Sequence, residues 1–184
     1  MSRASRFRRL HREVLVDNPW HRYCRDRYVQ RDGSEGDYYY VDMPGSCAAI
    51  PVFDDGTMAL VRVRRYLLGV DLWELPIGGM QEGERPLDVA RKELREEAGL
   101  VAEDWTALGV FAPYKGVSNE RCHVFLARDL REVPQELEPS EQISVHRMPI
   151  VDARRTLLDQ ECGDGQSMAG LMLLDRWLAA GNVL

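Results

Sequence analysis

The sequence lacks closely spaced cysteines. Its four cysteines lie far apart and form no CxxC pair: Cys24, Cys47, Cys122 and Cys162. A disulfide framework or a zinc site needs closely spaced or regularly patterned cysteines, so we expect neither. The cysteine pattern predicts reduced thiols in a cytoplasmic protein.

Long apolar stretches are missing as well. No run approaches the roughly 18 residues that a transmembrane helix needs, and the opening MSRASRFRRLHR lacks the apolar core of a secretory signal. Lysine is scarce, since Lys92 and Lys115 are the two lysines among 24 basic residues. The net charge of −6 argues against a general nucleic-acid binder. We therefore expect neither a membrane nor a nucleic acid as a partner.

Charge is unevenly distributed along the 184 residues, which are enough for one domain with an extension. Residues 1–31 hold nine arginines against three acidic residues, so this segment carries about +6 and the remainder about −12. Three interpretations stay open: a solvated arm or short helix, a transit peptide, or an arm that docks on the acidic body of a second subunit.

What the sequence does contain is a strongly patterned stretch at residues 78–100, GGMQEGERPLDVARKELREEAGL. Its apolar residues recur at helical spacing and form one stripe: Leu87, Ala90, Leu94 and Ala98. Pro86 suits the first helical turn and Gly99 the residue just past the end. The pattern therefore predicts a helix with one buried face.

Three glutamates lie side by side on the neighbouring face of this helix. Glu93, Glu96 and Glu97 are spaced i, i+3 and i+4, and each like-charge pair at such a spacing costs about 0.2–0.5 kcal/mol. Something positive should lie against them. Arginine and lysine side chains can serve, and so can hard divalent cations, which prefer carboxylate oxygen.

This stretch resembles the Nudix box, whose pattern is G-x5-E-x7-R-E-U-x-E-E-x-G-U, with U an aliphatic residue. The matching positions are Gly78, Glu84, Lys92, Glu93, Leu94, Glu96, Glu97, Gly99 and Leu100. Lys92 is the one departure, because the family has arginine there. Lysine keeps the charge but loses the planar fork that pairs with a carboxylate, so we expect a looser site.

The flanking segments resemble the ADP-ribose pyrophosphatase branch of that family. LVRVRRYLLGVDLWELPIGG is similar to the branch's LVRQYRY…ELPAG, and GVSNERCHVFLA is similar to its loop SPG-x-S-x-E and the strand that follows. The resemblance makes Arg65 a contact for substrate phosphates and Glu120 either a metal contact or the general base. Two residues depart from the branch: Val63 replaces a glutamine and Lys115 a proline.

The resemblance implies roles for the remaining candidates. Glu97, Glu96 and Glu120 are the catalytic candidates, and Glu84 is expected to orient the others. Arg65 is the substrate-binding candidate that the resemblance implies, and it is also open to being a surface cation paired with Glu74 or Glu82. Tyr40 and Lys115 are substrate-binding candidates by their own chemistry, because a tyrosine ring can stack on a base and a lysine can reach a phosphate or another acidic group. The expected metal ligands, holding Mg²⁺ or in its place Mn²⁺, are Gly78, Glu93, Glu96, Glu97 and Glu120.

The expected fold class is α/β with a mixed (α+β) sheet, and the resemblance implies the Nudix fold, an α/β/α sandwich, with an N-terminal β extension. Alternating and apolar runs predict strands at 24–30, 38–41, 46–53, 57–66, 105–112, 121–128 and 143–150. Further helices are expected at 151–160 and 167–180, and residues 129–142 as an exposed connection. Tyr38 and Tyr40 should share one face of their strand, and an exposed tyrosine there can stack on a nucleobase.

Two domains follow from this division. Residues 1–43 are expected to be a basic N-terminal arm and β extension that forms a dimer, since the resembled branch exchanges such a segment across a homodimer. Residues 44–184 are expected to be the Nudix hydrolase domain.

The leading functional hypothesis is an enzyme, a Mg²⁺-dependent Nudix pyrophosphatase. It would hydrolyse the diphosphate linkage of ADP-ribose or a related nucleoside diphosphate sugar by attack of water on phosphorus. Two alternatives stay open: a Nudix hydrolase of a dinucleotide cofactor or a nucleoside triphosphate, and a non-catalytic sensor that binds a nucleotide. The intact set of box carboxylates favours an enzyme.

Overall fold

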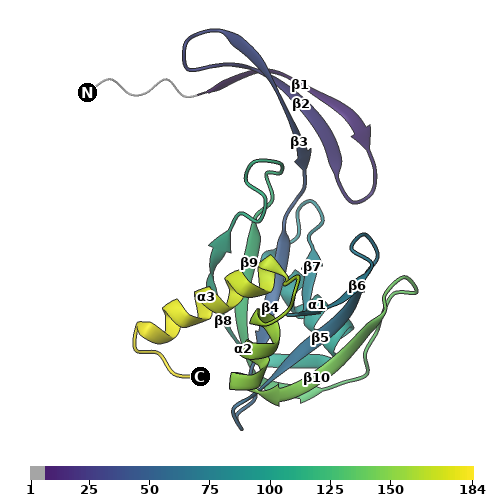
Figure 1. Ribbon diagram of the computed structural model, residues 1–184, viewed down its shortest axis with the longest axis vertical. Coiled ribbons are helices and arrows are strands. Elements are labelled where there is room, and N and C mark those ends of the chain that lie inside the picture. The colour runs from purple at the N-terminus through teal and green to yellow at the C-terminus, as the bar shows by residue number, and fades with distance from the viewer. Residues whose placement is uncertain (1–6) are drawn as a thin grey trace. The chain divides into compact units, whose positions relative to one another are not determined.

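The computed structural model describes residues 7–184 and divides into two compact units (Figure 1). The first unit combines the chain up to Pro44 with the segment Tyr114–Glu120, and the second combines Gly45–Pro113 with Arg121–Leu184.

The first unit is built on a three-stranded antiparallel sheet. The order along the sheet is β1 (Arg8–Asp17), β2 (Arg22–Val29) and β3 (Glu35–Asp42). Strand β1 lies inside the arginine-rich start, so the short helix is wrong for residues 8–17, which form a strand with mostly exposed side chains. Cross-strand ion pairs explain it, because Arg25 of β2 contacts Glu13 of β1 at 2.5 Å and opposite charges on neighbouring strands stabilise a sheet.

The segment Tyr114–Glu120 is attached to the end of β3. The Val41 N–H donates to the Val117 carbonyl (2.8 Å), and the Tyr38 hydroxyl donates to the Gly116 carbonyl (2.9 Å). The Met43 N–H donates to Asn119 Oδ1 (2.9 Å). This segment, which carries Lys115 and Glu120, is therefore held by the N-terminal sheet.

The second unit contains two sheets and three helices. One sheet has the order β7 (Ile77–Gly79), β4 (Ser46–Pro51), β9 (Cys122–Glu132), β8 (Leu100–Phe111), with β4 and β9 parallel. The other has the order β10 (Ile143–Pro149), β5 (Thr57–Arg65), β6 (Val70–Glu74) and is antiparallel. The helices are α1 (Pro86–Ala98), α2 (Ile150–Leu158) and α3 (Gly165–Ala179).

Strand β4 lies between two helical layers, which is why all six of its residues are buried. Ala48 and Ile50 pack in the core cluster that includes residues of α2 and α3. Cys47 and Ala49 point the other way, into clusters with α1. Figure 1 shows α3, in yellow, crossing in front of these strands. The predicted mixed sheet with helices on both faces is confirmed, and among the described residues no helix is long and apolar enough to cross a membrane.

Most predicted elements of the second unit are present, with shifted ends. Strand β8 begins at Leu100, five residues before the expected start, and the strands β6 and β7 were not predicted. In α3, Leu171 and Leu174 are buried, whereas Met172 is 73% exposed and lies outside the core face.

Candidate functional site

Helix α1 carries the predicted glutamates and has the predicted ends. Pro86 is its first residue, and Gly99 follows it in the left-handed conformation (φ 61°), which glycine adopts without strain. Glu93 and Glu97 are buried, whereas the Glu96 side chain is 29% exposed. The helix thus places two carboxylates inward and one at the rim.

The two inward carboxylates are unusually hard to ionise. Burial raises the pKa of Glu97 to about 8, and repulsion from Glu93 adds to this while the Ile77 N–H opposes it. Burial likewise raises the pKa of Glu93 to about 7; Lys92 lowers it and Glu96 raises it further. Buried carboxylates that repel one another are stabilised by a cation.

Gly78, at the centre of β7, lies directly against Glu93. A Cβ atom built on Gly78 would come within 1.9 Å of the Glu93 carboxyl carbon, so no larger residue fits without moving that side chain. At the neighbouring residue of β7, the Ile77 N–H donates to Glu97 Oε2 at 2.8 Å. The segment before the helix and the helix itself are therefore in close contact at the two inward glutamates.

Lys92, the departure from the box pattern, contacts the rim of this group. Its Nζ lies 3.4 Å from Glu96 Oε2 and 3.9 Å from Glu93 Oε1. These are the contacts of a point charge without the paired geometry of a guanidinium.

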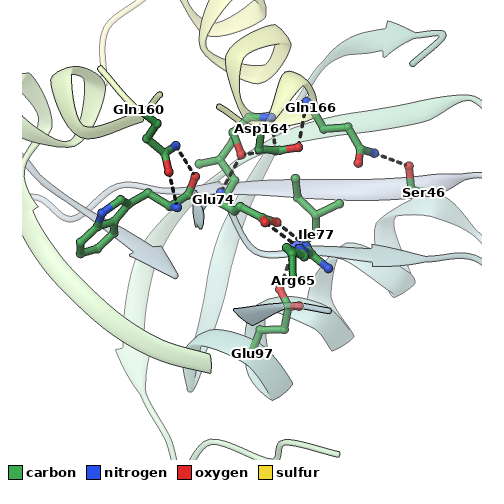
Figure 2. A network of polar contacts seen from close by, with 11 residues as sticks. Ser46, Arg65, Glu74, Ile77, Glu97, Gln160, Asp164 and Gln166 are labelled. Atoms are coloured by element: carbon green, nitrogen blue, oxygen red, sulfur yellow. Dashed lines mark hydrogen bonds and ion pairs between the residues drawn. The ribbon is translucent and has the colours of Figure 1, made fainter. Parts of the chain in front are cut away.

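Arg65, the last residue of β5, contacts the same region. Its Nε donates to Glu74 Oε1 at 2.7 Å, and a second donor, Nη2, contacts the other carboxylate oxygen (Figure 2). Glu74 is 2% exposed, whereas the Arg65 side chain is 43% exposed. The pKa of Arg65 is raised, first by its hydrogen bonds to Glu74 and also by the charge of Glu97. The alternative pairing with Glu74 is therefore present, and it leaves part of the guanidinium open to solvent.

Two glutamates near the box carboxylates come from the predicted exposed connection. The charges of Glu138 and Glu141 both raise the pKa of Glu93, and Glu141 also raises that of Glu97. This connection is attached to the end of α1, where the Val133 N–H donates to the Gly99 carbonyl at 2.8 Å. Sequence reasoning missed these glutamates because an acidic, proline-containing stretch gives no sign of where it folds back.

The other three candidates, Tyr40, Lys115 and Glu120, belong to the first unit. Tyr40 donates its hydroxyl to Asp26 Oδ1 (3.2 Å). Its ring lies 6.4 Å from that of Tyr38, in agreement with the shared face predicted for the two. Lys115 is exposed and Glu120 is buried.

The chemistry of the donor set fits a hard divalent cation. All candidate ligands are oxygens, Glu93 and Glu97 are buried and repel each other, and Gly78 brings main chain to within contact of Glu93. Among residues 7–184 as described, no three acidic, histidine or cysteine side chains already converge as a ligand group. Glu96 is instead drawn to Lys92, and Glu97 to the Ile77 N–H.

Comparison with known proteins agrees with the motif. A family model of the NUDIX domain matches residues 43–166. The ADP-ribose pyrophosphatase of Bacillus subtilis is 32% identical over 136 residues, which cover 73% of this chain and 74% of the relative. That of Mycobacterium tuberculosis is 35% identical over 131 residues, covering 70% of this chain but 63% of the relative.

Comparison of folds extends the likeness to the whole chain. A crystal structure of an ADP compounds hydrolase matches with a TM-score of 0.82 over 100% of both chains at 19% identity, which shows a shared fold. The predicted Nudix fold is therefore confirmed. The chain belongs to the Nudix family, as a pyrophosphatase that is similar to the two ADP-ribose pyrophosphatases.

Proposed function

We propose that this protein is a Mg²⁺-dependent hydrolase of the diphosphate linkage in ADP-ribose or a related nucleoside diphosphate sugar. The observation that carries the proposal is the pair of buried, mutually repelling carboxylates, Glu93 and Glu97, against Gly78 and within the electrostatic reach of Arg65. The names of the relatives support the substrate class.

The residues proposed to hold the metal are Gly78 through its carbonyl, with Glu93, Glu96, Glu97 and Glu120. Mg²⁺, or Mn²⁺ in its place, would mask phosphate charge and lower the pKa of a bound water. Glu93 and Glu97 must lose their protons to bind it. Glu96 must also leave its contact with Lys92. This costs little free energy, because a single contact at 3.4 Å to a half-exposed ammonium is weak.

Three residues are proposed to hold the substrate. Arg65 uses Nε and one terminal nitrogen for Glu74, so its remaining N–H groups are available to phosphate oxygens. Tyr40 is proposed to stack on the nucleobase, and the exposed Lys115 is proposed to contact a phosphate or other acidic group.

The reaction needs a group that takes a proton from the attacking water. The water oxygen bonds to phosphorus, the bond from phosphorus to the bridging oxygen breaks, and the second phosphate leaves. ADP-ribose would give AMP and ribose 5-phosphate. Glu120 is our first candidate for the base, and Glu141 is a second, because its charge acts on both Glu93 and Glu97. Separate Glu120→Gln and Glu141→Gln variants would identify the base as the one whose loss removes the rise of kcat with pH.

We also propose that the protein is a cytoplasmic homodimer, with residues 1–43 as the dimer-forming extension and 44–184 as the hydrolase domain. The support lies in the first unit, whose large apolar side chains are widely exposed, with Phe7 at 72% and Trp20 at 73%. A three-stranded sheet with so little buried surface is marginally stable alone. Sedimentation of the full chain at micromolar concentration decides this, and a monomer contradicts it.

The decisive experiment is a turnover screen of the full chain with ADP-ribose, other nucleoside diphosphate sugars, dinucleotide cofactors and nucleoside triphosphates. We expect AMP from ADP-ribose with Mg²⁺ and none after the metal is chelated. Faster turnover of dinucleotides or triphosphates would replace the substrate class. Binding of ADP-ribose without turnover of any compound would favour the sensor.

A further inference from the structure

The six residues Trp73–Gly78 run from the end of β6 into β7 and contact three residues of the candidate site, Arg65, Glu93 and Glu97. Glu74 holds Arg65 through two hydrogen bonds. The Ile77 N–H binds Glu97, and the Gly78 main chain touches the Glu93 carboxylate. A shift of this segment would therefore move Arg65 and Glu97 relative to each other.

The start of the segment is held by a side chain that follows α2. Gln160 Oε1 accepts the Trp73 N–H at 2.7 Å, and Gln160 Nε2 donates to the Trp73 carbonyl at 2.9 Å. Strand β6 is at the edge of its sheet, so the Gln160 amide takes the place of a neighbouring strand. Figure 2 shows it on the opposite side of the segment from Glu97.

The middle of the segment is held by the first turn of α3. The Leu75 N–H donates to Ser167 Oγ at 2.8 Å, and Ser167 Oγ donates its own proton to Asp164 Oδ2 at 2.6 Å. Asp164 is the N-cap of α3 and also accepts the Ser167 N–H. Ser167 is fully buried, so its hydroxyl has one orientation, with the proton toward Asp164 and a lone pair toward Leu75.

The same turn of α3 also contacts β4, the strand that pairs with the end of the segment. Gln166 Nε2 donates to Ser46 Oγ at 2.9 Å (Figure 2). Ser46 begins β4, whose next residue, Cys47, pairs with Gly78. The first turn of α3 therefore contacts both the middle of the segment and the strand beside its end.

We propose that Gln160 and Ser167 are positioning residues of the active site. Neither is placed against substrate or metal. They hold Trp73 and Leu75, which flank Glu74, and so fix the Arg65 guanidinium relative to the Glu97 carboxylate. The proposal rests on the proposed function for its reporter reaction, but its metal-binding readout does not need that substrate.

The test is the Ser167→Ala variant of the full chain, measured well below its melting temperature with ADP-ribose and Mg²⁺. We expect kcat to fall about tenfold, because sub-ångström displacement of reacting groups has effects of this size. The Mg²⁺ concentration for half-maximal rate should rise several-fold. Ser167→Thr keeps the hydroxyl and should restore both values.

A second variant and a matched control separate positioning from general stability. Gln160→Glu keeps the acceptor for the Trp73 N–H but loses the donor to its carbonyl, and it should weaken Mn²⁺ binding to the substrate-free protein. Thr156→Val removes a hydroxyl of α2 that contacts Met148 Sδ (3.7 Å) and not the segment, and it should behave as wild type.

The outcomes are distinguishable. If wild-type protein does not hydrolyse ADP-ribose, the proposed function fails and the Mn²⁺ affinities alone decide the positioning role. Wild-type kcat, Mg²⁺ dependence and Mn²⁺ affinity in folded Ser167→Ala and Gln160→Glu would overturn the proposal, as would the absence of Mn²⁺ binding by the wild type.

Discussion

Both units bury acidic side chains, but Asp42 of the first and the pair Glu93 and Glu97 of the second have opposite kinds of partner. In the first unit, Asp42 accepts from Arg12 (2.8 Å), Arg22 (3.3 Å) and the Asn119 amide (2.6 Å). In the second, Glu93 and Glu97 face each other and further carboxylates. An acid with its countercharges in place stabilises a fold. Acids buried without enough countercharge cost stability and are a mark of a functional site.

The two units also differ in how many hydrophobic side chains they bury. The second unit has a packed core over both faces of β4, whereas in the first Cys24 is the one buried hydrophobic residue among those described. The second unit can therefore carry its own stability. The first depends on ion pairs and on the surface that covers its exposed side chains.

The sharpest test of this contrast compares one leucine in each unit. Leu126→Ala, at a fully buried position of β9, should lower the free energy of unfolding by about 2–5 kcal/mol. Leu15→Ala, at a 40% exposed position of β1, should change it by less than about 0.5 kcal/mol. Urea denaturation at micromolar concentration measures both, and a large loss for Leu15→Ala would place that side chain in a dimer interface.

Glu97 of the second unit should raise kcat while lowering the stability of the metal-free protein. Glu97→Gln should lower kcat by at least about 100-fold, since even groups that only orient metal ligands contribute roughly 10- to 100-fold. The same variant should melt at or above the wild-type temperature without metal at pH 8 or higher, where the wild-type carboxyl is charged, because a neutral amide removes a repelling buried charge. Steady-state assays and calorimetry check the pair of effects, and near-normal turnover by folded Glu97→Gln would refute the assignment.

The raised pKa values predict that metal binding releases protons. In the metal-free protein the pKa of Glu97 is about 8 and that of Glu93 about 7, against an ordinary value of 4.5. The folded state thus binds more protons than the unfolded state between these values, so metal-free stability should fall as pH rises from about 4.5 to 8. Mg²⁺ affinity should rise over pH 6–8, by up to about tenfold per unit for each proton released. Calorimetry in buffers of different ionisation enthalpy measures this, and a pH-independent affinity contradicts it.

The last prediction concerns the ion-paired acid of the first unit. Asp42→Ala should cost about 1 kcal/mol, because the side chains of Arg12 and Arg22 are 33% and 40% exposed and water screens their charges. The loss should be local to β3 and residues 114–120. Hydrogen exchange should show faster exchange of the Val41 and Asn119 amides, while α1 stays unchanged.

The helical segment of the site was predictable because its signals are local. Pro86, Gly99 and the spacing of Leu87, Ala90, Leu94 and Ala98 fix the helix, and the box pattern identifies its glutamates. The contact of Arg65 with Glu74 was foreseen as one of two pairings. These inferences need nothing beyond neighbouring residues and a known motif.

What escaped prediction depends on distant partners. Strand β1 is rich in arginine, and arginines alone give no sign of a strand. Its pairing with β2 is explained by ion pairs between the two strands, Arg9 with Asp26 and Glu13 with Arg25. Strands β6 and β7 have five and three residues, too few for a periodic signal. Glu138 and Glu141 reach the site because their connection folds back onto α1, and Gln160 and Ser167 act through main-chain groups that no side-chain motif records.

One glycine links the end of the catalytic helix to the acidic connection. A side chain at Gly99 would need a strained backbone at φ 61°, and its Cβ would come within 2.8 Å of the Val133 carbonyl oxygen. Any larger residue at Gly99 would therefore displace residues 133–142 from the helix and disturb the end of the helix. Substitutions should be tolerated far less at Gly99 than at Gly116, where an added Cβ meets nothing. At Gly99 an added Cβ would displace the connection that carries Glu138 and Glu141 and so move these two glutamates away from the box.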